Sequence, residues 1–229
     1  MSKIITILKN HRGFLLFLFL LFIMRGSILD WHPVPTGSMK PTILEGDVIV
    51  QNKLAYDLQI PFTGISLMQL GQPKRGDIIV FNSQGSGKRM IKRLVGLPGD
   101  TIEIINNQLV VNGQHATYEP LTETDARIPK MSPDRDPGMY ATESTTDMAA
   151  HLTLVDTSKY NPHRNVPPFT IPEGNYFFMG DNRDNSADSR VYGYAPRSEL
   201  RGRAFNILIS VRYLEDWSPR WKRFWKSLY

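Results

Sequence analysis

The sequence predicts a mostly β protein: an antiparallel β-sheet body with a large insertion, an N-terminal transmembrane helix and a short C-terminal amphipathic helix. Three observations lead to this. Short segments with period-two alternation fill the middle of the chain, an uninterrupted apolar run lies near its start, and apolar residues recur at helical spacing near its end. The expected parts are residues 1–30 as the anchor, 31–213 as the β-rich domain and 214–229 as the C-terminal helix.

The N-terminal anchor is expected from the apolar run FLLFLFLLFIM at residues 14–24. A helix needs about 20 residues to cross a bilayer, so a span requires the helix to continue to about Leu29, with Arg12 and Arg25 extending toward opposite interfaces. A cleaved signal peptide would have small residues of the A-x-A kind after the run, and these are absent. A helix buried in the body is the other alternative, but a segment apolar on every side at a chain start has little to pack against.

Basic residues are concentrated at the two ends of the chain, although the whole sequence carries a net charge of +5. Both ends are also rich in apolar or aromatic residues, which favours a membrane surface over nucleic acid as the partner. The cations that precede the apolar run place the N-terminus in the cytoplasm and the body outside. The absence of cysteine excludes disulfides and a thiol nucleophile.

Strands are expected through the middle of the chain, because apolar and polar residues alternate and β-branched residues are frequent there. Asn106-Asn107 and Asn112-Gly113 have the composition of hairpin turns, since these residues tolerate positive φ. No long amphipathic helix interrupts this part, so we expect an antiparallel body. The expected strands are 47–51, 77–81, 89–97, 101–105, 108–111, 176–179 and 204–213.

Residues 114–172 differ from their surroundings in being rich in proline, threonine and acidic residues. We expect an insertion or small subdomain on the β body there.

The C-terminal segment 214–229 is expected to form a helix that Ser218 caps and Pro219 begins. Its large apolar residues then share one face, which suits an interfacial helix or, equally, a helix docked on the core of the body. These residues are Trp221, Phe224, Trp225 and Leu228.

A serine nucleophile needs a base to take its proton. Of the five histidines, only His32 lies near a glycine-flanked serine in the sequence, and a strand–turn–helix elbow is missing there, so a Ser-His-Asp site is a weak alternative. Lys92 lies on an expected strand with Met90 and Leu94 on the same face. Burial there would lower the pKa of the amine toward the range of a general base.

Three segments together resemble the type I signal peptidase family: PTGSMKPTILEGDVI at 35–49, KRGDIIVF with RMIKRLVGLPGD at 74–100, and GDNRDNSADSRVYG at 180–193. The resemblance implies a serine endopeptidase in which Ser38 is the nucleophile and Lys92 the base. Thr36 and the Ser38 N–H would stabilise the oxyanion, and Ser186 would orient the lysine.

The resemblance also implies supporting and substrate-binding residues. Site support is expected from Asp181, Asp188, Arg190 and Arg93, with Arg93 paired to one of the carboxylates. A pocket for small side chains is expected from Val34, Met39, Ile43 and Ile91, which would also suit an ordinary core.

The implied activity is removal of signal peptides from exported preproteins at the outer face of the bacterial inner membrane, by a monomer that uses no metal or organic cofactor. Signal-bearing preproteins and the lipid bilayer are the expected partners, and nucleic acid is not. A specialised peptidase that processes conjugation or pilus proteins would share Ser38 and Lys92. A membrane-tethered scaffold without catalysis is the alternative from another class.

Overall fold

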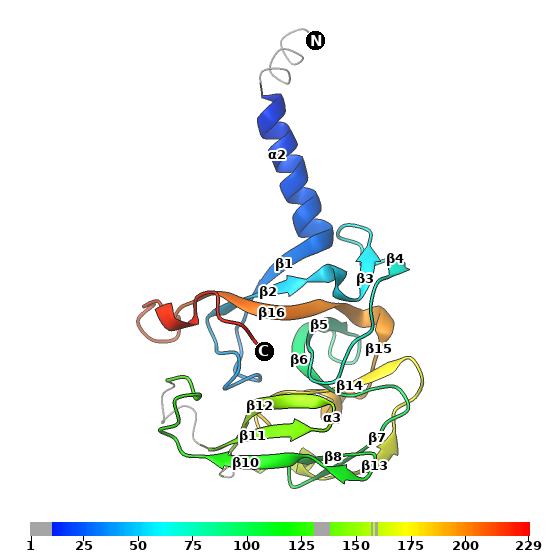
Figure 1. Ribbon diagram of the computed structural model, residues 1–229, viewed down its shortest axis with the longest axis vertical. Helices are drawn as coiled ribbons and strands as arrows, with labels where there is room; N and C mark the ends of the chain where they lie inside the picture. The colour runs from blue at the N-terminus through cyan, green and yellow to red at the C-terminus, as the bar shows by residue number, and fades with distance from the viewer. Residues whose placement is uncertain (1–10, 131–137, 157, 159) are drawn as a thin grey trace.

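The antiparallel β body predicted from the sequence is present in the computed structural model, which describes residues 11–130, 138–156, 158 and 160–229. Its largest sheet has seven strands in the order β1-β2-β16-β5-β6-β14-β15 (Figure 1). The strands are β1 (Leu29–Pro33), β2 (Asp47–Asn52), β5 (Ile78–Ser83), β6 (Lys88–Gly96), β14 (Asn175–Met179), β15 (Ala195–Pro196) and β16 (Leu200–Ser210).

Three smaller sheets complete the described strands. One has the order β13-β7-β8-β9, the second β10-β11-β12, and the third is the hairpin β3–β4. Their bounds are β3 (Asp57–Gln59), β4 (Ser66–Gln69), β7 (Thr101–Ile105), β8 (Gln108–Val111), β9 (Gln114–His115), β10 (Thr117–Leu121), β11 (Met139–Thr145), β12 (Met148–Val155) and β13 (Val166–Thr170).

All seven strands expected from alternation are present. The strand predicted at 204–213 differs most from the structure. It is β16, which begins at Leu200 and ends at Ser210. The two predicted turns are also confirmed. Asn106 and Asn107 have φ of 50° and 66° between β7 and β8, and Asn112 has φ of 52° between β8 and β9.

The predicted insertion contains a sheet of its own that contacts the loop after β14. Leu154 on β12 donates its N–H to the Asp181 carbonyl at 2.9 Å, and its carbonyl accepts from the Arg183 N–H at 2.9 Å. Met148, also on β12, lies in one apolar cluster with Val95 and Met179 of the large sheet. The insertion is therefore packed onto the body and braces the 180–190 loop.

Short helical turns connect the strands, and the longest described helix lies at the N-terminal end. Helix α2 (Arg12–Ile23) continues into a π-helical turn η1 (Met24–Ile28) and projects away from the sheets (Figure 1). The helical stretch therefore ends one residue before Leu29, close to the expected limit. The short turns are η2 (Lys53–Ala55), η3 (Pro162–Arg164), α3 (Ser189–Tyr192), η4 (Arg197–Glu199) and η5 (Trp221–Arg223).

Within the part of the chain that the structure describes, no helix combines the length and the apolar character that a membrane crossing requires.

The prediction of a C-terminal amphipathic helix was wrong. Between 214 and 229 the only helical element is the single turn η5, and Trp225 has a positive φ of 56°, which interrupts a helix. The segment instead forms backbone hydrogen bonds with β16: Ile207 N–H donates to the Lys226 carbonyl at 2.8 Å, and Leu228 N–H to the Phe205 carbonyl at 2.9 Å. Extended pairing with this strand edge satisfies backbone groups that a helix would have left open on β16.

Side chains also fix the C-terminal segment to the body, so the alternative of docking on the core holds, although without a helix. Leu228 joins the apolar cluster of Met39 and Ile43. Arg223 forms a buried ion pair with Asp47 at 2.6 Å. Trp221, which was expected on the same face as Leu228, is 71% exposed.

We expect Arg223→Ala to destabilise the fold by about 3–5 kcal/mol, because it leaves the fully buried Asp47 carboxylate without its cation. Lys222→Ala, at the exposed neighbouring position, should change the free energy of unfolding by no more than about 0.5 kcal/mol. Urea denaturation of both variants measures the difference. Equal stabilities would contradict the docked C-terminal segment.

Candidate active site

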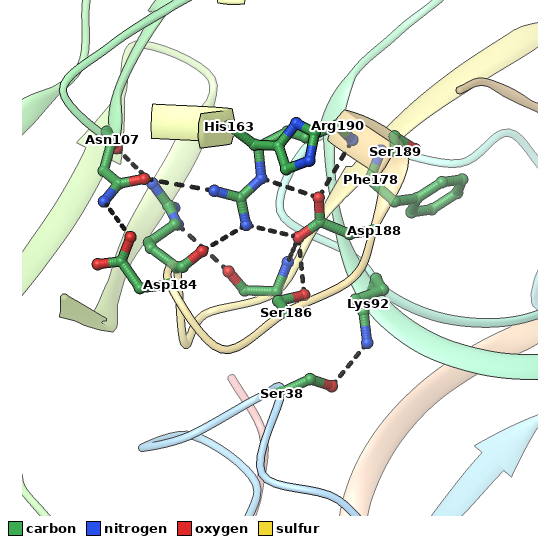
Figure 2. Close-up of polar contacts among 12 residues, drawn as sticks. Ser38, Lys92, Asn107, His163, Phe178, Asp184, Ser186, Asp188, Ser189 and Arg190 are labelled. Carbon is green, nitrogen blue, oxygen red and sulfur yellow. Dashed lines mark hydrogen bonds and ion pairs between the residues drawn. The ribbon is translucent and has the colours of Figure 1, made fainter. Parts of the chain in front are cut away.

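Ser38 and Lys92, predicted as nucleophile and base, are in direct contact. The Lys92 Nζ lies 2.6 Å from the Ser38 Oγ and 3.2 Å from the Ile91 carbonyl oxygen (Figure 2). Ser38 sits in the turn region between β1 and β2, whereas Lys92 lies within β6. Two segments 54 residues apart in sequence thus bring an amine and a hydroxyl within hydrogen-bond distance.

Burial gives Lys92 the character of a base. Its side chain is among the buried polar groups, with the residue only 5% exposed. Desolvation lowers the pKa of the Lys92 amine to about 8, and the charge of Arg190 acts in the same direction, whereas Asp188 and Asp181 oppose it. With that pKa, roughly one molecule in ten carries the neutral amine at pH 7.

The turn that carries Ser38 is held by Asn182 from the loop after β14. The Asn182 backbone N–H donates to the Ser38 carbonyl at 3.1 Å, and its side-chain amide donates to the Gly37 carbonyl at 3.0 Å. Gly180 in the same loop allows this approach: a Cβ there would lie 2.4 Å from the Ser38 carbonyl oxygen and 2.2 Å from the Ser186 Oγ. Contacts with the backbone of residues 37 and 38 therefore set the position of the Ser38 hydroxyl.

Ser186, predicted to orient the lysine, donates its hydroxyl to the Asp188 carboxylate at 2.7 Å. Among the described residues, no hydrogen bond joins Ser186 to Lys92, so the orienting contact stays a prediction. Figure 2 shows Ser186 and Asp188 beside Lys92, joined to each other by a hydrogen bond and not to the lysine. The contact that the structure does provide links Ser186 to a buried carboxylate.

Arg190 holds the Asp188 carboxylate in place, and both were predicted as supporting residues. The Arg190 guanidinium donates to the two Asp188 oxygens at 2.9 Å each, and the Gly180 N–H donates to the same carboxylate at 2.9 Å. Burial alone would raise the pKa of Asp188. The charge of Arg190 and these hydrogen bonds outweigh burial, so the pKa of the Asp188 carboxyl is lowered. The ionised form of Asp188 is thus favoured, and Arg190 lies in an ion pair with it.

Arg93 pairs with Asp181. The sequence predicted a carboxylate partner for Arg93 without deciding which one. The two bonds measure 2.8 Å and 2.7 Å, and both side chains are buried. Asp181 also accepts the Thr42 hydroxyl at 2.5 Å. Since Arg93 follows Lys92 on β6 and Thr42 follows Ser38 by four residues, this pair ties together the segments that carry both reactive groups.

A cavity of about 660 Å³ opens beside Ser38 and Lys92. The four residues predicted to form the substrate pocket all line it: Val34, Met39, Ile43 and Ile91. The first three are also buried members of one core cluster, and Ile91 packs against it, so each serves as both core and wall. The cavity can therefore receive an apolar side chain next to the hydroxyl.

Thr36, predicted for the oxyanion, is exposed and lines the same cavity. Its hydroxyl forms no hydrogen bond with any described residue, which leaves it available to a ligand. His32 lines the cavity too, but its Nε2 is 2.6 Å from the Gln51 side-chain oxygen. The titratable side chain that contacts the Ser38 hydroxyl is therefore Lys92 and not a histidine.

Sequence reasoning missed Gly180 and Asn182 as site residues, although both lie in the GDNRDNSADSRVYG segment. Gly180 contributes by allowing two backbones to approach, and Asn182 by donating hydrogen bonds to two carbonyl oxygens. Composition carries no signal for either contribution. The glycine that opens this polar segment was the available hint, because glycine is the residue that permits close approach of two backbones.

We expect Gly180→Ala to reduce activity by about 100-fold or more while the protein remains folded, because the added Cβ displaces the Ser38 turn by the order of an ångström. Gly13→Ala, where a Cβ meets nothing within 4 Å, is the matched control. Turnover and thermal unfolding are measured on both. A folded Gly180→Ala protein with full activity would contradict the positioning role.

Comparison with known proteins shows the family to which the chain belongs. The sequence model of the family described as "Signal peptidase, peptidase S26" matches residues 7–209. A Signal peptidase I of Pseudomonas aeruginosa is 33% identical, with 92% of this chain and 75% of the relative covered. One of Rickettsia typhi is 32% identical over 98% and 95% of the two chains.

A solved structure, that of a signal peptidase I from Enterococcus faecalis, is 31% identical in sequence and covers 58% of this chain and 96% of its own. Its TM-score is 0.34, so the likeness of the two folds adds nothing to the sequence match. On the sequence matches, the chain belongs to the signal peptidase family, peptidase S26, and is a hydrolase of the serine endopeptidase class.

Proposed function

We propose that the protein is a membrane-bound serine endopeptidase that removes N-terminal signal peptides from exported preproteins, with Ser38 as nucleophile and neutral Lys92 as general base. The observation that carries the proposal is the 2.6 Å contact between the buried Lys92 Nζ and the Ser38 Oγ beside an apolar cavity. Membership of the signal peptidase family supplies the substrate class.

In the acylation step, the Ser38 hydroxyl gives its proton to the Lys92 Nζ as its oxygen attacks the scissile carbonyl carbon. The carbonyl π electrons move to the oxygen, and the tetrahedral oxyanion is held by the Ser38 N–H and the Thr36 hydroxyl. When this intermediate collapses, the carbon–nitrogen bond breaks and the Lys92 ammonium protonates the leaving amine. The mature protein leaves with a new N-terminus.

Deacylation repeats the proton transfers with water. Lys92, neutral again, takes a proton from a water molecule that attacks the ester carbonyl, and then returns a proton to the Ser38 oxygen as the ester bond breaks. The signal peptide departs as a carboxylic acid. Every proton passes through one amine, so its pKa controls both halves of the reaction.

The supporting residues act on this amine by charge and by position. Asp181 and Asp188 raise the pKa of Lys92, and the paired Arg93 and Arg190 limit this effect, so that desolvation still lowers the pKa of the amine. The apolar wall of the cavity excludes water from the amine and accepts a small apolar side chain of the substrate near Ser38.

The proposal places the protein at the inner membrane, with a cytoplasmic N-terminus and the β body on the outer side. Residues 14–22, within α2, are apolar and largely exposed around the whole helix. The twelve residues of α2 rise about 18 Å, and η1 adds one turn. Because this is shorter than a hydrocarbon layer of ~30 Å, an anchor that crosses the layer requires Arg12 and Arg25 to extend toward opposite interfaces. Such an anchor would hold the site near membrane-bound preproteins and raise their effective concentration.

The decisive variants are Ser38→Ala, Lys92→Ala and Lys92→Arg, each assayed as the full chain in detergent with a signal-bearing preprotein. We expect cleavage to fall by about 10³-fold or more in all three, because an arginine keeps its proton and cannot act as base. Lys74→Ala, an exposed lysine away from the cavity, should leave cleavage unchanged.

Activity retained in Lys92→Ala would remove the lysine from the role of base. A folded wild-type chain that cleaves no preprotein but processes a pilus or conjugation protein would establish the specialised alternative. Biological function that survives in Ser38→Ala would favour a non-catalytic scaffold.

The pH dependence of kcat/KM should show a single ascending limb with an apparent pKa near 8. The protonated ammonium has no lone pair with which to accept the Ser38 proton, so activity falls about tenfold for each pH unit below this value and levels off above it. Initial rates with a signal-bearing peptide, measured from about three pH units below this pKa to about two above it, give the profile. A limb near 6.5, the ordinary histidine pKa, would assign the base to a histidine instead.

A further inference from the structure

The cavity beside the reactive serine and lysine has two parts that differ in chemistry. Next to the Ser38 hydroxyl its wall is apolar and includes Val34 and Ile91. Another part of the wall is polar and basic, and the proposed reaction uses none of it. The residues there are His32, Lys88 and Arg89. No aspartate or glutamate among the described residues lines the cavity, so this part has an excess of positive charge.

Two strand segments lead from the apolar part of the cavity to the basic part. Ile91 and Arg89 are two residues apart on β6 and therefore lie on the same face of the strand. Val34 and His32 are related in the same way, because the Val34 N–H donates to the Asp47 carbonyl at 2.8 Å and extends the β1–β2 pairing beyond β1. Residues two apart on a strand are spaced by about 6.6 Å. The basic part thus begins one such step from the apolar part.

Arg89 carries its positive charge in this part of the cavity without a counter-ion. Its Nε donates to the Asn82 Oδ1 at 3.1 Å, and its side chain forms no ion pair with any described residue. The charge acts on the neighbouring imidazole: burial lowers the pKa of His32 most, and Arg89 lowers it further, against a hydrogen bond and the charge of Asp30. Asp30 itself lies 3.4 Å from Arg25. A carboxylate that enters the cavity would therefore meet an arginine that no other carboxylate occupies.

A peptide substrate in extended conformation matches this spacing. Its alternate side chains point to one face and recur at about the same 6.6 Å. When the side chain before the scissile bond occupies the apolar part, the side chain two residues earlier in the signal peptide lies at the level of His32 and Arg89. The intervening side chain points to the other face of the peptide, away from both parts.

We propose that His32 and Arg89 form a specificity site that prefers an acidic side chain, and disfavours a basic one, at the third residue before the scissile bond of the signal peptide. A guanidinium binds a carboxylate through two parallel hydrogen bonds, whereas a basic side chain of the substrate would meet a like charge. His32 supplies a polar neighbour to the entering group. This inference rests on the proposed peptidase function, whose substrate it specifies.

Peptides that span a signal-peptide cleavage site test the proposal, with Glu, Gln or Lys as the third residue before the scissile bond. The same substitutions at the second residue before the bond form the matched control, because that side chain points to the other face. The measurement is kcat/KM for the full chain in a non-ionic detergent. We expect the Glu peptide to be cleaved about tenfold better than the Lys peptide at the third residue, and within about twofold of it at the second.

Variants of Arg89 assign the preference to this side chain. The ratio of kcat/KM for the Glu and Lys peptides should fall to about 1 in Arg89→Gln, invert in Arg89→Glu and be largely retained in Arg89→Lys. Lys74→Gln, which is exposed and away from the cavity, should keep the wild-type ratio. Because each ratio compares two substrates on one enzyme, a general loss of activity or stability cancels. Salt at about 1 M should reduce the wild-type ratio, since it screens exposed charges.

Equal cleavage of the Glu and Lys peptides by the wild-type protein would overturn the proposal and leave the peptidase function intact. A ratio that is unchanged in Arg89→Glu would also overturn it. So would the same preference at the second residue before the bond, because it would indicate a general attraction of anionic peptides to the basic chain. A wild-type protein that cleaves none of the peptides would refute the proposed function and this inference with it.

Discussion

The structure depends on one electrostatic constraint: the Lys92 amine is held out of water, 2.6 Å from the Ser38 hydroxyl, and the proposed reaction requires this amine to be uncharged part of the time. Two buried carboxylates lie near enough to raise its pKa and oppose this. Each is compensated by its own arginine, Asp181 by Arg93 and Asp188 by Arg190. Desolvation therefore remains the dominant influence on the lysine, and the pKa of its amine falls to about 8.

The fold supplies this arrangement by placing three segments side by side. Strand β6 carries Lys92 and Arg93 in succession, and the neighbouring strand β14 leads into the loop that holds the Ser38 turn through Asn182. The insertion sheet braces the same loop from its other side, since the buried Glu143 on β11 pairs with Arg183 at 2.6 Å. Through these contacts the insertion sheet stabilises the polar loop.

Strand positions could be predicted from the sequence because they depend on local alternation. The proximity of Ser38 and Lys92 could be predicted because both lie in recognisable motifs, and their catalytic roles stay predictions. The pairing of Arg93 with a carboxylate could also be predicted. Its partner, Asp181, could be identified only from the fold. The C-terminal segment was predicted wrongly because Trp221 and Leu228 recur at helical spacing, whereas the open edge of β16 favours extended pairing. A single sequence does not reveal such long-range competition for backbone hydrogen bonds.

The most direct test of the central claim is a titration of the Lys92 amine itself in the folded protein. Lysine side chains labelled with ¹⁵N report their protonation by NMR, and Lys92→Arg identifies the resonance by its loss. A midpoint near pH 8, well below those of the exposed lysines, is the predicted result. A midpoint near the ordinary lysine value of 10.5 would show that the amine is not desolvated in solution, and the neutral-lysine mechanism would be contradicted.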